Sequence, residues 1–381
     1  MSAVRLEFLA CRRVAGEVAG ARALPCAGRV SQRMLLEALA RGADGVAVVP
    51  CGVERHGCRF ERGAERAAMV VARTRRLLAT VGVAPERVAC LTPAEPAAFS
   101  ATVERMGPTG LAPWTRPVAP GLDGSLTLLA ALLADPAARP AWSRRAPLGP
   151  GETCETLFLH GVAPLAGVLL EEALPGADAG DPPALLAAAG IEARELSDER
   201  GAGGPLRAAG ETERFADLAR RNAERFAATG ARRIVTACVA CARTLTEGYA
   251  AVGVRLPMPV VPLVQALVEA GARVTDGTAL RLPACDADGA AAWDALLPSV
   301  KPATRRSPCA AGGWLGGSSS RVAIDEAVTT AAKRGAERVY ADCLRCALST
   351  ALAARTGSWS RATPRLVPLG AIDPGRVEVV R

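Results

Sequence analysis

The sequence predicts an α/β protein: a parallel, doubly wound N-terminal domain followed by a two-copy, cysteine-rich α/β region. Three observations support this fold class. Short apolar segments alternate with segments of helical periodicity, which is typical of parallel sheets covered by helices. Residues 230–245 align without gaps with residues 335–350. Several of the 12 cysteines directly follow a predicted strand.

Residues 1–112 form the predicted doubly wound domain. Ser31 can cap a helix that runs to Arg41 and stops at Gly42. Hydrophobic spacing predicts the elements that follow, which are a strand at 45–50, a helix at 64–80, a strand at 87–91 and a helix that ends near Gly107.

The chain is rich in proline between residues 108 and 151, which is typical of a linker or an elaborated surface. We assign residues 113–152 to this segment, with a short apolar helix at 125–133 inside it. A second α/β region begins with the apolar strand at 156–160. Its repeat divides the region into halves, residues 153–272 and 273–381.

The composition is that of a folded, soluble protein. Half of the 381 residues are hydrophobic and 22% are charged, whereas a disordered chain buries too little apolar surface to offset its ordering entropy. A membrane helix needs about 18 consecutive apolar residues, and the longest runs, at 126–133 and 185–191, are shorter. Charged residues interrupt the N-terminal segment, so no signal peptide is expected. We therefore expect a cytoplasmic protein without a membrane span.

The basic excess does not indicate nucleic-acid binding. The formal net charge is +8, and only Lys301 and Lys333 among the 46 basic residues are lysines. These charges are spread along the chain, and no recognisable nucleic-acid-binding module accompanies them. We expect protein partners and no nucleic acid.

Each repeated segment has a Gly-Ala break, an apolar strand and then a Cys-x-x-Cys motif that opens the next helix. Residues 42–51 in the first domain follow a similar pattern and end at Cys51. Parallel sheets bind ligands at the carboxyl ends of their strands, and helix N-terminal amides favour thiolate over thiol. Cysteines at three such positions indicate a bound group.

The first domain holds four candidate ligands of a metal centre, which are Cys11, Cys26, Cys51 and Cys58. Four thiolates are the usual shell of an iron–sulfur cluster or of zinc, and their spacing does not choose between the two. Four buried free thiols are the alternative. We interpret Cys90, Cys154 and His160 as structural and His56 as a solvated loop residue.

The segments CRRVAGEVAG (11–20), LPCAGRVSQRMLLEALARGADGVAVVPCGVERHGCRF (24–59) and VGVAPERVAC (81–90) resemble the delta subunit of methyl-viologen-reducing hydrogenase. The resemblance covers about residues 6–107. It implies a 2Fe–2S electron-transfer module between an electron source and the flavoprotein of heterodisulfide reductase. The four candidate cysteines fall on cysteines of that family. One further family cysteine, just before Cys11, is absent here, and the second loop ends in Cys-Arg-Phe instead of Cys-His-Tyr.

Residues 155–355 resemble the cysteine-rich (Cys-Cys-Gly) domains of heterodisulfide reductase subunits B and D. Residues 203–245 are similar to the first such domain, while PACDADG (283–289), PCAAGG (308–313) and DCLRC (342–346) match the second. In that family a lone Cys, a Cys-Cys pair and a Cys-x-x-Cys motif together ligate a 4Fe–4S cluster.

The two copies keep this pattern unevenly. In the first, Gly161 and Gly201–Ala202 replace the lone Cys and the pair, so only Cys238 and Cys241 remain. Two thiolates cannot complete a cluster shell, and we interpret this pair either as a redox dithiol or as relic thiols. In the second copy Pro308 replaces one member of the pair. Four candidate ligands of one 4Fe–4S cluster or one zinc ion remain there, Cys285, Cys309, Cys343 and Cys346.

Our leading hypothesis is an iron–sulfur electron-transfer subunit of a hydrogenase- or heterodisulfide-reductase-like oxidoreductase complex. Its implied cofactors are a 2Fe–2S cluster and a second centre with 4Fe–4S or zinc. Its implied partners are flavoprotein and iron–sulfur subunits of an HdrA-like (heterodisulfide reductase), hydrogenase or formate dehydrogenase complex. The sequence has no flavin or nicotinamide fingerprint, so no catalytic residue is assigned. Two alternatives stay open: a zinc-binding structural or regulatory protein, and a disulfide reductase that retains the chemistry of the cysteine-rich domains.

Overall fold

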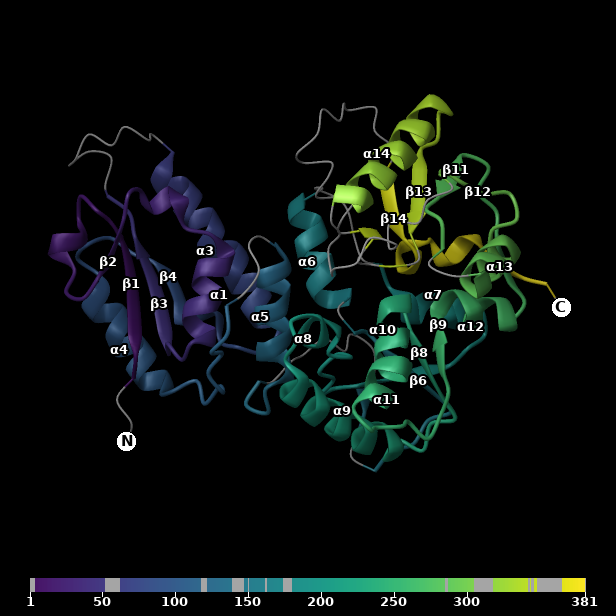
Figure 1. Ribbon diagram of the computed structural model, residues 1–381, viewed down its shortest axis with the longest axis horizontal. Coiled ribbons are helices and arrows are strands. Elements are labelled where there is room, and N and C mark those ends of the chain that lie inside the picture. The colour runs from purple at the N-terminus through teal and green to yellow at the C-terminus, as the bar shows by residue number, and fades with distance from the viewer. Residues whose placement is uncertain are drawn as a thin grey trace. The chain divides into compact units, whose positions relative to one another are not determined.

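The computed structural model divides the chain into two compact units, Met1–Ala141 and Trp142–Arg381 (Figure 1). Both units are α/β, and their larger sheets are parallel, as the sequence predicts. The structure describes residues 4–51, 62–117, 122–138, 147–149, 151–161, 163–173, 180–284, 287–304, 318–341, 343, 346–347 and 365–380.

The first unit is built on four parallel strands in the order β2 (Arg22–Leu24), β1 (Leu6–Cys11), β3 (Gly45–Val49) and β4 (Val88–Cys90). Its helices are α1 (Gln32–Ala40), α3 (Gly63–Thr80), α4 (Pro96–Met106) and α5 (Leu122–Ala134). Helix α4 covers one face of the sheet and helices α1 and α3 cover the other (Figure 1). Short 3₁₀ turns occupy η1 (Ala15–Glu17), η2 (Ala27–Arg29) and η3 (Pro85–Arg87).

The predicted elements of this unit are confirmed, with shifts of one to a few residues at their ends. The side chain of Ser31 caps α1 by accepting a hydrogen bond from the Met34 amide at 3.3 Å. Gly42 follows this helix with a φ of +96°, a conformation that glycine adopts without steric cost. Helix α5, inside the proline-rich segment, packs against α1.

Gly45 lets helix α4 lie close to the sheet. A Cβ atom at this position would come within 2.7 Å of Val103 Cγ2, 3.0 Å of Leu6 Cδ2 and 3.1 Å of Phe99 Cζ. The preceding Asp44 joins two ends of the unit, because its carboxylate accepts hydrogen bonds from the Arg5 amide at 2.8 Å and the Thr109 amide at 2.7 Å. The Gly-Ala-Asp-Gly-Val segment therefore has a structural role in this unit.

A Gly45→Ala variant is expected to lower the free energy of unfolding of the first unit by about 1–3 kcal/mol, the usual cost of overpacking a filled core. Urea denaturation would measure the change. Gly16→Ala is the matched control, since nothing lies within 4 Å of a Cβ atom placed there. Equal unfolding midpoints for the two variants would contradict the close packing of α4.

The second unit contains two parallel sheets. One has five strands in the order β5 (Pro147–Leu148), β7 (Ala193–Leu196), β6 (Thr156–Leu159), β8 (Arg233–Thr236) and β9 (Val260–Pro262). The other has four strands in the order β12 (Lys301–Pro302), β11 (Ala279–Arg281), β13 (Arg338–Ala341) and β14 (Arg365–Pro368). A separate antiparallel pair joins β10 (Ala272–Val274) to β15 (Val377–Val379).

Helices connect these strands. In the first half they are α6 (Ala163–Ala173), α7 (Pro182–Ala188), α8 (Gly204–Ala208), α9 (Thr212–Ala227), α10 (Val239–Arg243), the π-helical turn η4 (Thr244–Gly248), α11 (Tyr249–Ala251) and α12 (Leu263–Glu269). In the second half they are α13 (Ala287–Leu296), α14 (Ser318–Lys333), η6 (Leu369–Ala371) and η7 (Pro374–Arg376). Strands β8 and β13 begin and end at aligned positions of the two repeated segments. The two-copy interpretation of the whole region stays a prediction, since part of the second copy lies outside the described residues.

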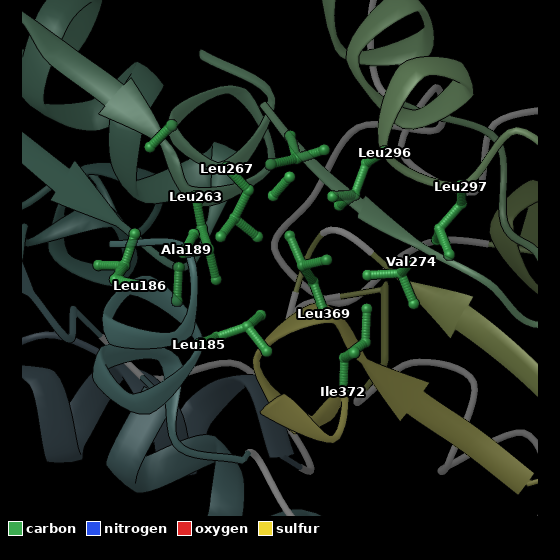
Figure 2. Close-up of a cluster of buried hydrophobic side chains, with 14 of the residues drawn as sticks. Leu185, Leu186, Ala189, Leu263, Leu267, Val274, Leu296, Leu297, Leu369 and Ile372 are labelled. Atoms are coloured by element: carbon green, nitrogen blue, oxygen red, sulfur yellow. The ribbon is translucent and has the colours of Figure 1, made fainter. Parts of the chain in front are cut away.

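One hydrophobic core joins the two halves of this unit. Figure 2 shows Leu185 and Leu186 of α7 and Leu263 of α12 facing Leu296 of α13 and Leu369 of η6. The same cluster continues into both sheets. Because burial of shared apolar surface stabilises both sides together, the halves are expected to fold cooperatively.

A buried carboxylate with partly exposed arginine partners lies just after β10 in the second half. The carboxylate of Asp276 accepts hydrogen bonds from Arg338 Nε at 2.8 Å, from Tyr340 Oη at 2.6 Å and from Arg376 Nη1 at 3.2 Å. The hydrogen bonds from Arg338 hold the pKa of Asp276 well below its usual range, although burial acts in the opposite direction. The charged form of this carboxylate therefore links β10, β13 and η7.

None of the helices in the described part of the chain combines the length and the hydrophobicity needed to cross a bilayer.

Candidate metal centres

Three predicted ligands lie at the carboxyl edge of the sheet in the first unit. Cys11 is the last residue of β1, Cys26 follows β2 and Cys51 follows β3. These strands are neighbours, with β1 between the other two. The three side chains are buried, with exposed fractions of 2%, 6% and 5%. The fourth predicted ligand, Cys58, lies outside the described residues, as does His56.

The surrounding backbone favours the thiolate form of Cys11. Burial alone would raise the pKa of this thiol, but the backbone amides of Arg13, Ala27 and Cys51 and the thiol of Cys51 all form hydrogen bonds to its sulfur. Together they lower the pKa below its ordinary value. Amide hydrogen bonds to sulfur also stabilise metal-bound thiolates and tune the reduction potential of iron–sulfur clusters.

The turn that carries Cys26 lies very close to the start of α3. A Cβ atom at Gly28 would come within 2.8 Å of Gly63 Cα and 2.9 Å of the Gly63 carbonyl oxygen. Only glycine permits this distance between the two backbones. Gly28 therefore positions the turn that brings the Ala27 amide to the sulfur of Cys11.

Cys90 lies in a different environment from these three cysteines. Cys90 is the last residue of β4 and pairs with Val48 of β3. It therefore lies within the paired part of the sheet, whereas Cys51 lies beyond the end of β3. Burial raises the pKa of Cys90, with a smaller opposing effect of Arg75. A neutral thiol is the expected form of this residue.

In the second unit, the Cys-x-x-Cys motifs of the two halves meet. Cys238 follows β8, Cys343 follows β13, and their Sγ atoms are 3.8 Å apart. Both residues are buried, with exposed fractions of 1% and 0%. Each carbonyl accepts a 3.0 Å hydrogen bond from the amide four residues later, that of Ala242 or Ala347. The carboxyl ends of β8 and β13 therefore face each other, although they belong to different sheets.

Cys241 fills the space left by the missing first cysteine. A Cβ atom at Gly161 would come within 2.5 Å of Cys241 Sγ, and Gly161 has a φ of +63°. Cys241 also forms a hydrogen bond with Cys238, and this contact together with burial raises the pKa of Cys238, against an opposing effect of Cys343. The position where a lone cysteine would stand in a complete motif is closed by this thiol.

A buried acid that sequence reasoning missed lies beside Gly161. The carboxylate of Glu199 accepts hydrogen bonds from the Gly161 amide at 2.7 Å and the His160 amide at 2.9 Å. Burial raises the pKa of Glu199 to about 7, although His160 and the two amides favour its charged form. His160 Nε2 in turn lies 3.5 Å from Glu195 Oε1. The sequence signal that could have identified Glu199 is an acidic residue shortly after β7, at the carboxyl edge of the sheet where Gly161 also lies.

The structure leaves the predicted second ligand set incomplete. Cys346 is buried, with an exposed fraction of 5%, and Cys343 is close to Cys238, whereas Cys285 and Cys309 lie outside the described residues. No disulfide joins any of the nine cysteines in the described part of the chain. Among the described residues, no group of three or more His, Cys, Asp or Glu side chains is already arranged to hold a metal ion. Soft thiolate donors nevertheless suit iron–sulfur clusters and zinc.

Two family models match parts of the chain. Residues 19–108 match the methyl-viologen-reducing hydrogenase delta subunit, and residues 183–246 match the cysteine-rich domain. The first match includes Cys26 and Cys51 and begins after Cys11, and the second includes Cys238 and Cys241.

One relative is similar to a part of the chain. The chain is 38% identical over 65 residues to the iron-sulfur D subunit of the F420-non-reducing hydrogenase of Archaeoglobus profundus. The aligned stretch is 17% of this chain and 46% of the relative, so the chain spans about half of that protein's length. The chain thus has one region similar to the hydrogenase delta subunit and, later, one region similar to the cysteine-rich domain.

Proposed function

Because the chain joins a hydrogenase-delta-subunit domain to a cysteine-rich domain, we propose that it is an iron–sulfur electron-transfer subunit of an oxidoreductase complex. Its first unit would hold a 2Fe–2S cluster on Cys11, Cys26, Cys51 and Cys58. Its partners would be flavoprotein and iron–sulfur subunits of a complex related to hydrogenase, heterodisulfide reductase or formate dehydrogenase.

The arrangement around Cys11 carries this proposal. Three buried cysteines lie at the ends of three neighbouring strands, and three backbone amides together with the Cys51 thiol form hydrogen bonds to the sulfur of Cys11. A buried thiol in an apolar core has no need of such donors, and burial alone would keep it protonated. The donors instead suit a negatively charged sulfur, which is the form that ligates iron.

In the first unit, some residues would bind the cluster and others would set its reduction potential. The cysteines hold the cluster, while Gly28 and the amides of Arg13, Ala27 and Cys51 set the distance of the backbone from sulfur. A bound 2Fe–2S cluster accepts and donates one electron at a time. Burial of the ligands excludes water from the sulfurs and restricts electron exchange to docked partners.

The second unit would hold a further thiolate centre. The set proposed from the sequence is Cys285, Cys309, Cys343 and Cys346, with either a 4Fe–4S cluster or zinc. Two observations support a centre in this unit: the match to the cysteine-rich domain, and the burial of Cys343 at a strand end beside a second thiol.

Metal analysis of the anaerobically purified chain tests the proposal. We expect iron and acid-labile sulfide, with a 2Fe–2S EPR signal after reduction by dithionite. About two irons per chain would correspond to the first centre alone and about six to both centres, given the clusters that four thiolates hold. Stoichiometric zinc without sulfide would overturn the electron-transfer function and favour a structural or regulatory protein.

A further inference from the structure

We infer that Cys238 and Cys343 bind the same metal ion, so that the second unit has one thiolate centre shared by its two halves. The inference deepens the proposed function and rests on its assignment of a metal centre to this unit. The ligands differ from those of the proposed function, because Cys238 belongs to the first half of the unit, in which the cluster motif is incomplete.

The distance between the two sulfurs is that of neighbouring ligands of one metal. Metal–sulfur bonds of about 2.3 Å at tetrahedral angles place two ligand sulfurs about 3.8 Å apart. Cys238 Sγ and Cys343 Sγ are separated by 3.8 Å. A disulfide would require about 2.05 Å, so the two sulfurs have the separation of two ligands of one metal and not that of a disulfide.

Because these two thiols are buried, their charged thiolate forms are stable only beside a bound cation. Their exposed fractions are 1% and 0%, so water cannot solvate a charge on either sulfur. Two adjacent thiolates in such a site would repel each other strongly, whereas a shared divalent cation neutralises both. As a pair, they are therefore either neutral thiols or ligands of one metal.

The second cysteine of each motif supplies the remaining ligands. Cys241 is buried and already forms a hydrogen bond with Cys238. Cys346 is also buried, and it stands three residues after Cys343, as Cys241 does after Cys238. These two thiols would have to turn toward the metal to bind it, because no three of the described side chains are already arranged around a metal position. Such a set of four thiolates favours zinc or a 2Fe–2S cluster, because two cysteines bind one metal ion in both, whereas each iron of a 4Fe–4S cluster takes only one cysteine.

The test compares metal content in four forms of the full-length chain: wild type, Cys238→Ser, Cys343→Ser and the control Cys154→Ser. Each form is stripped of metal anaerobically and reloaded either with Zn²⁺ alone or with ferrous iron and sulfide. We expect both Cys238→Ser and Cys343→Ser to lose the whole metal complement of the second unit, while Cys154→Ser retains it. The loading that restores it distinguishes zinc from iron–sulfur.

Two results would overturn the inference. One is a Cys238→Ser protein that keeps all the metal that Cys343→Ser loses, since the centre would then belong to the second half alone. The other is wild-type protein that takes up no metal in this unit and yields a Cys238–Cys343 disulfide in non-reduced peptide maps. Urea unfolding and a Cys238→Ala variant, which keeps an apolar side chain at the buried site, separate ligand loss from misfolding. Absence of the 2Fe–2S signal in wild-type protein would count against the proposed function instead.

Discussion

A Cys51→Ser variant should lack the 2Fe–2S EPR signal and about two irons per chain, while the metal of the second unit remains. The Cys51→Ser substitution removes one proposed ligand and the side-chain hydrogen bond to Cys11, while the backbone amide of residue 51 stays in place. A serine hydroxyl is rarely ionised and is a poor substitute for thiolate. Visible absorption, EPR and iron analysis on anaerobic protein would measure the change.

Cys90→Ser is the matched control for this variant. Cys90 ends the neighbouring strand of the same sheet, but it lies inside the register and burial raises its pKa. The control should therefore keep the absorbance and the iron of wild type. If Cys51→Ser also kept both, the assignment of the first centre to this sheet edge would be wrong.

An Asp276→Ala variant should lose about 1.5–3 kcal/mol of the free energy of unfolding of the second unit, the usual contribution of hydrogen bonds to a charged group. The carboxylate is almost fully buried, and its removal takes away an acceptor shared by Arg338 and Tyr340, while Arg338 keeps its contacts with Thr278 and Glu337. Urea denaturation followed by circular dichroism would measure the loss. Metal content should be determined in parallel, because a metal bound to the folded state also stabilises it.

Asp198→Ala provides the comparison for an exposed pair. Its carboxylate contacts Arg225 Nε at 3.0 Å, but the side chains are 50% and 38% exposed, so the expected loss is at most about 1 kcal/mol.

The stabilising effect of Asp276 should depend on pH, because its pKa is lower in the folded protein than in the unfolded chain. Asp276 contributes stability above the unfolded-state pKa of about 3.9, and this contribution is lost as the pH falls toward the folded-state pKa. The difference between wild type and Asp276→Asn should therefore shrink below about pH 4. A difference that is constant with pH would contradict the ionic role.

Local patterns in the chain were sufficient to predict most elements of the first unit. The Ser31 cap, the apolar strand at 45–50 and the periodic helix at 64–80 depend on neighbouring residues, and each occurs in the structure. The same reasoning placed Cys51 at a strand end, and adjacency of the strands brought it to Cys11. The Ala27 amide donor to Cys11 could not be predicted, because its position depends on the close approach of the turn at Gly28 to α3.

The sequence by itself determined the α/β class, the positions of the strand-end cysteines and the absence of three cysteines from the first repeat. Tertiary structure alone decided that Cys241 fills the space at Gly161 and that Cys238 meets Cys343. The physical reason is that a motif fixes only the local backbone and the spacing of its own ligands. Contact between residues 105 positions apart depends on how two sheets pack around the core that their halves share.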